Sequence, residues 1–157
     1  MQIEQRSPPT GALRVFMRFP IWLYRLKLGG LLGGRFLCLH HIGRVSGQVR
    51  KAVVEVMRYD QVSDAYMIVS GYGRRSQWYQ NLKKSPAVDI EVGRKKLRVM
   101  ADFLSVQQGE AELRGYAERY PKAWAALAKS MGYMNGGKLA DFSVLSEYLP
   151  VIALRPA

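Results

Sequence analysis

The chain has 157 residues, 48% of them hydrophobic, with one cysteine and a net charge of +12 at pH 7. This composition fits a single domain with a real core, excludes a disulfide framework and argues against intrinsic disorder. Residues 1–101 hold 18 of the 24 Lys and Arg residues but only 6 of the 12 Asp and Glu residues. The excess positive charge predicts an anionic partner, either nucleic acid, lipid headgroups or a phosphorylated ligand, unless it serves solubility alone.

The N-terminal stretch is apolar but interrupted. Residues 12–34, ALRVFMRFPIWLYRLKLGGLLGG, contain four basic residues and a proline, so they do not predict a membrane-spanning helix. On a helix Arg14, Arg18 and Arg25 fall on one face, which predicts a cationic amphipathic helix over residues 12–28. Such a helix either lies on an anionic membrane surface or packs on the core with its arginines in water. We expect a cytoplasmic protein, with peripheral attachment to the inner face of the membrane as an open alternative.

Beyond residue 34 the apolar pattern becomes that of strands. Residues 49–59 carry apolar side chains on both faces, which predicts burial on both sides for part of their length. Residues 87–92 and 95–104 alternate between apolar and polar, with Val88 and Ile90 expected inside. In chain order the predicted strands are 35–43, 49–59, 65–70, 87–92, 95–104 and 147–156.

Three helical pieces are predicted between these strands. Ser76 is positioned to cap a helix at 76–85, which a following proline stops. The Ser-x-x-Gln pattern at 105–108 is a capping box that precedes a second helix. A third piece begins at Pro121, and residues 133–143 after it have the composition of a loop.

Six antiparallel strands in hairpins close best into a small barrel with helices over the gaps, which gives a mainly β, α+β fold. We expect residues 35–157 to form this barrel domain and residues 1–34 to form a separate helical segment. Cys38 fits a buried hydrophobic residue, and His40 and His41 fit polar packing. One cysteine and two histidines argue against a structural metal site.

Two basic, glycine-containing segments are the candidate binding elements. The first is GRVSGQVRK at residues 43–51, where two glycines free the turn and the backbone amides are expected to point outward. Arg44, Ser46 and Arg50 surround these amides. Backbone donors, a hydroxyl and fork-shaped cations together suit a phosphate or a carboxylate. The alternative is an ordinary hairpin loop, because basic Gly-Ser turns are common there.

The second segment is SGYGRRSQWYQNLKK at residues 70–84. Its two glycines allow a flat ligand to approach the backbone, and its two arginines add positive charge. The helix that begins after Ser76 points its free amides at the same place. Trp78 and Tyr79 either wall a flat slot or pack in the core. We expect this segment and the turn at 43–51 to converge on a single positive pocket with a flat slot beside it.

Together these motifs resemble the deazaflavin-dependent nitroreductase and quinone reductase family. The resemblance rests on GRVSGQVRK, on VSGYGRRSQWYQNLKKSPAVDIEVG and on a Tyr-Pro pair before the terminal strand, and it covers roughly residues 35–157. It implies a split β-barrel related to the pyridoxamine-phosphate oxidase and flavin-reductase barrels. It also implies the deazaflavin coenzyme F-420 as cofactor, whose polyanionic tail would account for the basic charge.

The resemblance also implies roles for particular residues. In the family, the glycine-rich turn and the arginine after it hold the phosphate and oligoglutamate tail, while the strand end and the next helix border the ring. The tail-binding residues carried over in this way are Arg44, Ser46, Gly47 and Arg50. The ring-bordering residues are Ser70, Gly71, Tyr72, Gly73, Arg74, Trp78 and Asn81.

The chain departs from the family pattern at several positions. Val45 stands where the family turn often has a lysine or arginine, so one tail contact is missing. Ala123 and Ala126 stand where nitroimidazole-reducing members carry tyrosines, which leaves the substrate open. The residues expected to wall the substrate side and to donate a proton to the product are Tyr120, Trp124 and Tyr133.

The function implied by the resemblance is hydride transfer from the reduced coenzyme to a quinone-like or nitroaromatic acceptor. Split barrels in related families often pair as dimers, so a homodimer is one of the open alternatives for the oligomeric state. A second hypothesis is a non-catalytic barrel that carries FMN, haem or another tetrapyrrole. A third is a nucleic-acid-binding barrel, suggested by charge alone. The chain lacks an aromatic RNA-binding strand and a helix-turn-helix pattern, so we expect no nucleic-acid partner.

Overall fold

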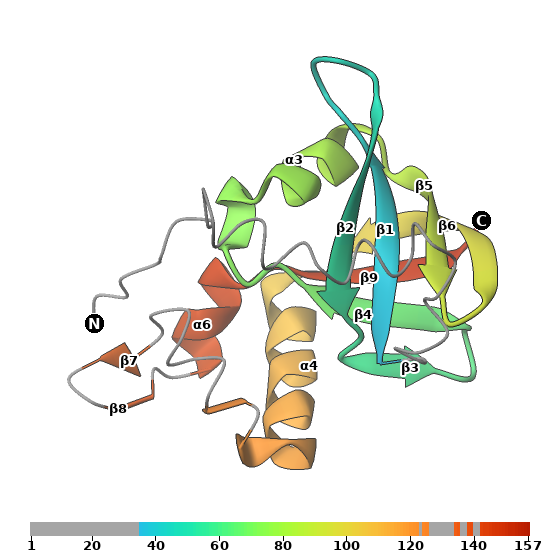
Figure 1. Ribbon diagram of the computed structural model, residues 1–157. Coiled ribbons are helices and arrows are strands. Elements are labelled where there is room, and N and C mark those ends of the chain that lie inside the picture. Colours follow the sequence, from blue (N-terminus) through green and yellow to red (C-terminus); the bar gives the residue numbers. More distant parts are fainter. Residues whose placement is uncertain (1–34, 123, 126–133, 136–137, 140–141) are drawn as a thin grey trace.

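The computed structural model describes residues 35–122, 124–125, 134–135, 138–139 and 142–157. Seven strands form one curled antiparallel sheet in the order β2-β1-β5-β6-β9-β4-β3, and β7 pairs with β8 in a separate hairpin (Figure 1). The strands are β1 (Phe36–Ile42), β2 (Val49–Glu55), β3 (Arg58–Asp60), β4 (Ala65–Val69), β5 (Ala87–Val92), β6 (Lys95–Phe103), β7 (Met134–Asn135), β8 (Lys138–Leu139) and β9 (Val151–Pro156). The predicted α+β half-barrel is confirmed, with seven strands in its sheet instead of six.

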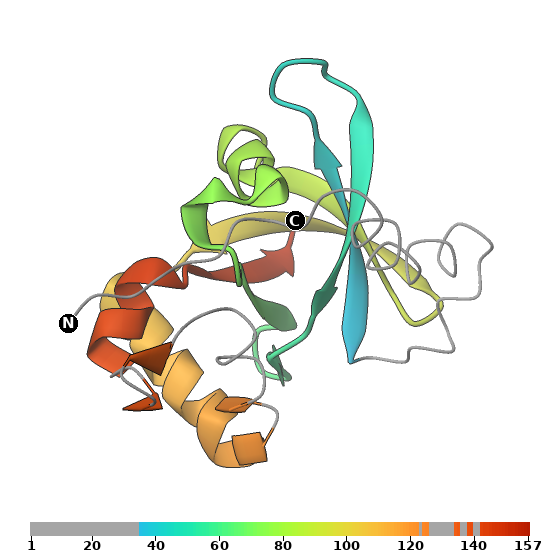
Figure 2. The same cartoon turned by 60° about the vertical axis from the view of Figure 1, so that its left-hand side comes forward.

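Helices cover the two faces of this sheet. The 3-10 turn η2 (Gly73–Arg75) leads into α3 (Gln77–Lys84), and the longer helices are α4 (Val106–Arg119) and α6 (Phe142–Tyr148). Residues 121–122 and 124–125 are also helical, as predicted for the third piece. Figure 2 shows α4 and α6 side by side on one side of the sheet and α3 on the other. Within the described ranges, no helix has the length and apolar character needed to cross a bilayer.

The predicted strand 49–59 is wrong in its extent, because the chain breaks it at Val56 and Met57. The Val56 N–H donates to the Arg35 carbonyl oxygen at 2.8 Å, whereas the Met57 N–H donates to the carbonyl oxygen of Met67 in β4 at the same distance. The backbone therefore passes from the β1 edge to the β4 edge within two residues. This crossing curls the sheet and adds the seventh strand. Contrary to the expected burial on both faces, β2 has no fully buried residue.

Helix α4 is fastened to this crossing by side-chain hydrogen bonds. Arg58 Nε and Nη2 donate to the two carboxylate oxygens of Glu112 at 3.1 and 2.7 Å. The Tyr116 hydroxyl donates to Glu55 Oε1 at 3.0 Å. Paired bonds between arginine and carboxylate fix an orientation as well as a distance, so they set the angle of α4 against the strands.

Two apolar clusters pack on opposite faces of β4 and β9, which is why both strands are buried on both sides. The barrel cluster takes Ile68, Ile152 and Leu154 from these strands and receives Tyr79 and Leu82 from α3. The second cluster takes Met67, Val151 and Ala153 and receives Leu113 from α4 and Leu145 from α6. The sheet therefore places α3 on one face, and α4 and α6 on the other.

The C-terminal region differs most from prediction. Residues 142–148 form α6, where the sequence predicted a loop and then the start of a strand at 147. The short strands β7 and β8 lie inside the predicted loop 133–143. Helix α6 has seven residues, and one this short depends on packing rather than on intrinsic propensity. Its buried Leu145 supplies that packing.

Several local predictions are confirmed. In β5 and β6, Val88 pairs with Val99 and Ile90 pairs with Leu97, so the predicted inward faces meet. Both bonds of the capping box at 105–108 are present, at 3.0 and 3.2 Å. The predicted boundary at residue 34 and the amphipathic helix at 12–28 lie outside the described residues.

Candidate functional site

Helix α3 connects the two segments that the sequence marks as binding elements. Its N-terminal end follows residues 70–76, and its C-terminal end lies against the turn at 43–48 between β1 and β2 (Figures 1 and 2). Eight residues at 1.5 Å each make α3 about 12 Å long. The two segments therefore lie at opposite ends of one helix, and the single pocket expected around them stays a prediction.

At the C-terminal end, Asn81 binds the turn. Its side-chain oxygen accepts hydrogen bonds from the backbone N–H of Arg44 at 3.0 Å and from Arg44 Nη1 at 2.9 Å. Asn81 is 3% exposed, so these two donors replace the water that its carbonyl oxygen has lost. In this structure Asn81, which the resemblance assigned to the border of the coenzyme ring, positions the turn at 43–48.

The amide group of Asn81 also faces His41. Asn81 Nδ2 lies 2.9 Å from His41 Nδ1. Because the oxygen of Asn81 already accepts two hydrogen bonds, its NH₂ group donates here, and we assign the ring proton to Nε2. Burial, and then the charge of Arg50, lower the pKa of His41 from 6.5 to about 4. The ring is therefore neutral at pH 7 and serves as an acceptor.

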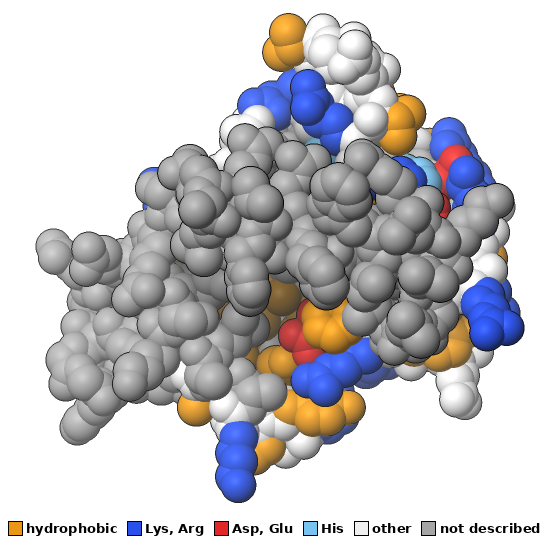
Figure 3. All heavy atoms as spheres, viewed as in Figure 1, with side chains coloured by type: hydrophobic (Ala, Val, Ile, Leu, Met, Phe, Trp, Pro, Cys, Tyr) orange, Lys and Arg blue, Asp and Glu red, His pale blue; other side chains and the backbone are white. Residues whose placement is uncertain are grey.

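Three cationic side chains surround the turn. Lys84 Nζ donates to the Arg44 carbonyl oxygen at 2.7 Å. A β-carbon on Gly43 would lie 3.6 Å from Arg50 Nε, which places Arg50 beside the turn as well. Figure 3 shows Lys and Arg side chains gathered below the tip of the β1–β2 hairpin. Arg44, Arg50 and Lys84 thus supply the positive charge that an anionic ligand requires.

The backbone amides of the turn are used differently from the prediction. The N–H groups of Gly43, Arg44, Gly47 and Gln48 donate to acceptors within the protein, one of which is Ser46 Oγ at 3.2 Å from Gln48 N. These four donors do not point outward to a ligand. Gly47, at φ 71°, has no atom within 4 Å of a β-carbon position, so the outer surface of the turn is open. An anion at this turn would be held mainly by side chains.

The N-terminal end of α3 begins without a side-chain cap. Ser76 is the N-cap residue, as predicted, but its side chain makes no cap hydrogen bond. The N–H groups of the first helical turn, at the positive end of the helix, therefore receive no hydrogen bond from the Ser76 side chain. Just before them, Ser70 Oγ donates to the Gly73 carbonyl oxygen at 2.6 Å, and the Gly73 N–H donates to the Ser70 carbonyl oxygen at 3.0 Å. Gly73, at φ 70°, has the backbone conformation that favours glycine.

A cavity of about 250 Å³ lies along one side of α3, where Tyr79 and Lys83 line it. It is lined by residues of α3, the end of β6, the start of α4 and the segment that joins α6 to β9. Arg74 and Pro150 belong to its lining, and the Ser70 N–H donates to the Pro150 carbonyl oxygen at 3.1 Å. The cavity therefore adjoins the turn at 70–73. Arg44 and Arg50 do not line it.

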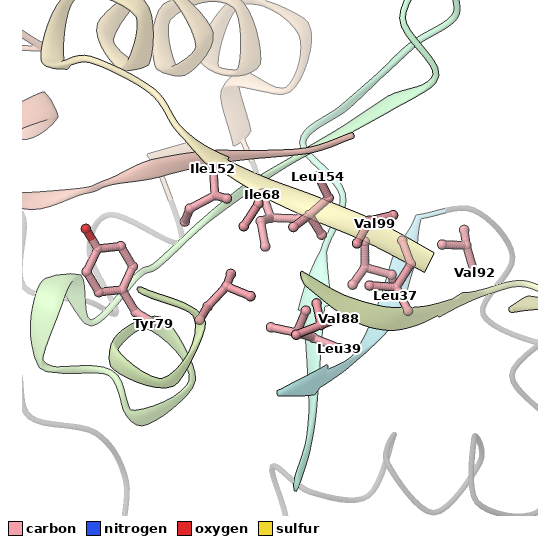
Figure 4. Close-up of a cluster of buried hydrophobic side chains, with 12 residues drawn as sticks. Leu37, Leu39, Ile68, Tyr79, Val88, Val92, Val99, Ile152 and Leu154 are labelled. Atoms are coloured by element: carbon pink, nitrogen blue, oxygen red, sulfur yellow. The ribbon is translucent and has the colours of Figure 1, made fainter. Parts of the chain in front are cut away.

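Aromatic side chains stand between this cavity and the barrel cluster. Tyr79 is 6% exposed, and its ring lies at 88° to that of Phe103, with centroids 5.6 Å apart. In Figure 4, Tyr79 is at the edge of the apolar side chains, with its hydroxyl end pointing away from them. Trp78 packs edge-on against Tyr79 and is only partly buried. Tyr79 is therefore a core residue, whereas Trp78 has exposed surface that a flat ring could cover.

Of the residues predicted to wall the substrate, the two that the structure describes, Tyr120 and Trp124, do not line this cavity. Tyr120 is the C-cap of α4 and is 50% exposed, whereas the cavity lies at the start of this helix of 14 residues, about 21 Å long. Trp124 is 5% exposed and stacks on Phe142 in the second cluster. Tyr133 lies outside the described residues. Their predicted roles stay predictions.

Cys38 and His40 lie on β1, away from both ends of α3. Burial, and then the charge of Glu91, raise the pKa of the Cys38 thiol to about 12. His40 Nε2 lies 2.8 Å from Glu91 Oε1, and burial lowers the pKa of the ring despite that carboxylate. These contacts agree with the packing roles predicted for both residues.

Sequence reasoning missed His41, Lys83 and Lys84 as parts of the two sites. Lys84 follows Asn81 by three residues and so shares its helical face, which is the one signal that could have identified it. Lys83 lies on the cavity side, with its Nζ 4.2 Å from the centre of the Phe103 ring. The role of His41 depends on a residue 40 positions away, and no local pattern reveals it.

Comparisons with known proteins show the family of the chain. A family model described as F420H(2)-dependent quinone reductase matches residues 17–131. An F420H(2)-dependent quinone reductase from Mycobacterium tuberculosis is 40% identical over 122 residues, which cover 75% of this chain and 71% of the relative.

Two solved structures share the fold. An F420-H2-dependent reductase has a TM-score of 0.53 at 20% identity, covering 77% of this chain and 94% of its own. A pyridoxamine 5'-phosphate oxidase-related, FMN-binding protein from Nostoc punctiforme has a TM-score of 0.52 at 12% identity, covering 94% and 81%. At these sequence identities the two structures support the split-barrel fold alone. The family model matches most of the chain and therefore shows the family. The chain therefore belongs to the F420H(2)-dependent quinone reductase family and is an oxidoreductase that depends on the deazaflavin coenzyme F-420.

Proposed function

We propose that this protein transfers a hydride from reduced coenzyme F-420 to a quinone, and that the coenzyme lies along helix α3. One observation carries the proposal: α3 joins a cationic turn at its C-terminal end to a glycine-containing turn at its N-terminal end, where the Ser76 side chain makes no cap hydrogen bond. The resemblance implies a coenzyme with a polyanionic tail and a flat ring. The two ends of α3 match these two parts.

The side chains near the turn fit an anionic tail. Arg50 and Lys84 are exposed and lie beside the turn, where their charges attract phosphate and carboxylate groups. The Arg44 guanidinium has five N–H donors, and Asn81 occupies one nitrogen of the fork. We assign tail binding to these three cations, with Ser46 and Gly47 at the open surface of the turn.

The other end of α3 fits the ring. The turn at 70–73, closed on itself by the Ser70 and Gly73 bonds, offers a fixed backbone edge that a planar group can approach. The start of α3 is the positive end of the helix dipole, so it stabilises negative charge on a group that approaches it. Trp78 is the aromatic side chain available to cover one side of the ring.

A quinone is the proposed acceptor because the M. tuberculosis relative is named as a quinone reductase. When bound, the reduced coenzyme supplies a hydride, which is two electrons and one proton, and a quinone needs one further proton from water to become a hydroquinone. A nitroaromatic acceptor, a homodimer, a cytoplasmic location and membrane docking through residues 12–28 stay predictions.

An anaerobic assay tests this function. Purified protein is mixed with reduced coenzyme F-420 and menadione, and reoxidation of the coenzyme is followed by its absorbance and fluorescence. We expect reoxidation to depend on both protein and quinone. Parallel titrations with the coenzyme and with FMN should show saturable binding of the coenzyme alone. Binding of FMN in preference to the coenzyme, or binding of the coenzyme without any quinone turnover, would refute the proposal.

A further inference from the structure

We propose that residues 12–34 pack against the outer face of β1, which carries Cys38 and His40. This contact goes beyond the proposed function and does not depend on it. The occupant is a segment of the same chain, so the contact is intramolecular. The cationic amphipathic helix predicted for residues 12–28 would then lie on the barrel, with its arginines in water, rather than on an anionic membrane.

Strand β1 is buried on both of its faces. Leu37 and Leu39 point into the barrel cluster, to which α3 also contributes (Figure 4). Successive side chains of a strand point to opposite faces, so Cys38 and His40 point outward from the barrel. Both are buried all the same, and Cys38 is 0% exposed although it belongs to neither apolar cluster. The outer face of β1 therefore has a cover of its own.

The described parts of the chain do not supply this cover. Helix α3 packs on the inner face of β1, and α4 and α6 pack on β4 and β9 (Figure 2). Helix α4 reaches β2 through Glu55, which is the last residue of that strand. The neighbours of Cys38 across the sheet, Val53 and Glu91, are only partly buried themselves, so they do not close over it. The cover over Cys38 therefore comes from residues outside the described ranges.

Residues 12–34 fit this face by position and by length. They lead directly into β1, which begins at Phe36. The seven residues of β1 span about 23 Å, and a helix over residues 12–28 would be about 25 Å long. Residues 29–34 include four glycines, which allow the chain to reverse its direction between the helix and the strand. The family model also begins at residue 17, within this segment.

A helix placed in this way brings an apolar side chain over Cys38. At about 100° per residue, Phe16 and Leu23 lie opposite the arginine face of the predicted helix. Leu23 is five residues from the end of this helix, or about 8 Å. Cys38 is two residues from the start of β1, or about 7 Å. A helix that returns antiparallel to β1 therefore places Leu23 over Cys38 and over Val53, its neighbour on the outer face.

The charges beside β1 suit a basic segment better than an anionic membrane. On the outer face, the register partners of β1 are Val49, Lys51, Val53 and Glu55 of β2 and Asp89 and Glu91 of β5. This set carries three carboxylates and one ammonium group. The carboxylates repel negatively charged lipid headgroups, whereas they attract the four basic residues of the segment 12–34.

Thiol labelling of the full chain tests the contact. Cys38 is the only cysteine, so the rate at which it reacts with N-ethylmaleimide in native buffer reports on its cover. Leu23→Asp places a charge in the contact, and we expect the labelling rate to rise about tenfold or more. The matched control is Arg25→Asp, at a similar depth on the opposite side of the helix, which should leave the rate unchanged. Urea unfolding of each variant gives the part of the rate that comes from global unfolding, and this part is subtracted.

A cross-link keeps the test decisive if Leu23→Asp does not fold. A disulfide needs two Cα atoms within about 7 Å of each other, so it reports contact directly. We expect oxidation with copper–phenanthroline to join Leu23→Cys to Cys38 within one monomer, and Arg25→Cys to stay reduced. Failure of Leu23→Cys to cross-link, or equal cross-linking of Arg25→Cys, overturns the proposal. An unchanged labelling rate in folded Leu23→Asp overturns it too.

Two further measurements separate the other occupants of this face. Labelling of the wild-type protein is repeated at low and high protein concentration, and with and without phosphatidylglycerol vesicles. A slow rate that depends on neither supports a cover made of residues 12–34. Faster labelling on dilution assigns the face to a second copy of the chain, and protection that requires the vesicles assigns it to a membrane. Either result overturns the proposal.

Discussion

The C-terminal end of α3 is tied down by hydrogen bonds to buried groups, whereas its N-terminal end has no side-chain cap. At the tied end, Asn81, His41 and Arg44 satisfy one another, and Lys84 adds a fourth contact. At the open end, Ser76 leaves the helix amides unpaired by its side chain. One helix thus combines a hydrogen-bonded support for the cationic turn with an N-terminal end that Ser76 does not cap. Stability and ligand binding are expected to respond to different residues at the two ends.

Replacing Asn81 by leucine should have the largest effect, because it removes the hydrogen bonds that distinguish the C-terminal end of α3. Leucine has a similar size but no polar atoms, so the Arg44 donors and the His41 ring nitrogen lose their partner. Unpaired buried polar groups cost about 1–3 kcal/mol each, so we expect the free energy of unfolding to fall by about 4 kcal/mol in urea unfolding experiments.

The matched control for Asn81→Leu lies at the other end of the helix. Gln77 is an exposed amide side chain, and Gln77→Leu should change the free energy of unfolding by about 0.5 kcal/mol or less. Equal losses in the two variants would show that the network around Asn81 does not distinguish the ends of α3.

The second-largest expected effect is that acid destabilises the hydrogen-bond network at the C-terminal end of α3. The unfolded chain protonates His41 near pH 6.5, but the folded protein protonates it only near a pKa of about 4. Between these two pH values the unfolded state binds more protons than the folded state. The stabilisation that neutral His41 gives the folded protein is therefore complete above pH 6.5 and is lost as the pH falls toward 4. The difference between the pKa values of His41 in the unfolded and folded states corresponds to about 3 kcal/mol in the free energy of unfolding. Urea unfolding at a series of pH values measures it.

The variant His41→Asn isolates this effect. Asparagine offers an acceptor near the position of Nδ1 but takes up no proton, so its stability should fall less steeply between pH 6.5 and 4. The other titrating groups, including His40, are retained in both proteins. Identical pH profiles would mean that His41 does not carry the expected acid sensitivity.

Arg50→Gln should affect ligand binding rather than folding. Arg50 is exposed beside the turn, so its loss removes one charge facing the proposed coenzyme tail. We expect the dissociation constant of the coenzyme to rise about tenfold at low salt, and by less at high salt. Fluorescence titration measures both, with Lys95→Gln as the control for a general loss of charge. A similar weakening by Lys95→Gln would assign the effect to net charge instead of to the turn.

The smallest expected effect compares two serine caps. Ser105 makes both bonds of a capping box, so Ser105→Ala should cost about 1 kcal/mol. Ser76 makes no side-chain cap bond, so Ser76→Ala should cost only about a few tenths of a kcal/mol. Thermal unfolding of the two variants compares them. A larger loss for Ser76→Ala would show that the open end of α3 is capped in solution.

Features set by neighbouring residues could be predicted from the sequence. The alternation of β5 and β6, the capping box of α4 and the positions of α3 and the turn at 43–48 all follow from short-range patterns. The break between β2 and β3 could not, because Val56 and Met57 are as suited to a continuous strand as their neighbours. Strand β2 ends there because Val56 and Met57 bond to different parts of the sheet. These bonds exist only once the sheet has formed.

The candidate site, like the fold, could be predicted only in part. Its two basic segments stand out in the sequence, but their separation by the length of α3 does not. The position of Asn81 depends on contacts with residues 37 and 40 positions away, and helix α6 depends on the packing of Leu145. Such long-range contacts leave no local periodicity, which is why the turn was expected to offer its amides to a ligand when four of them are used internally.

The state of the single cysteine has a consequence for an enzyme proposed to handle quinones. Quinones are electrophiles that arylate thiolates, and a thiol of ordinary pKa near the surface would be modified during turnover. Cys38 is fully buried, and its thiol, with a pKa of about 12, stays protonated at neutral pH. The protein therefore carries no readily alkylated sulfhydryl, and its chemistry can run in the presence of reactive electrophiles without self-inactivation through this residue.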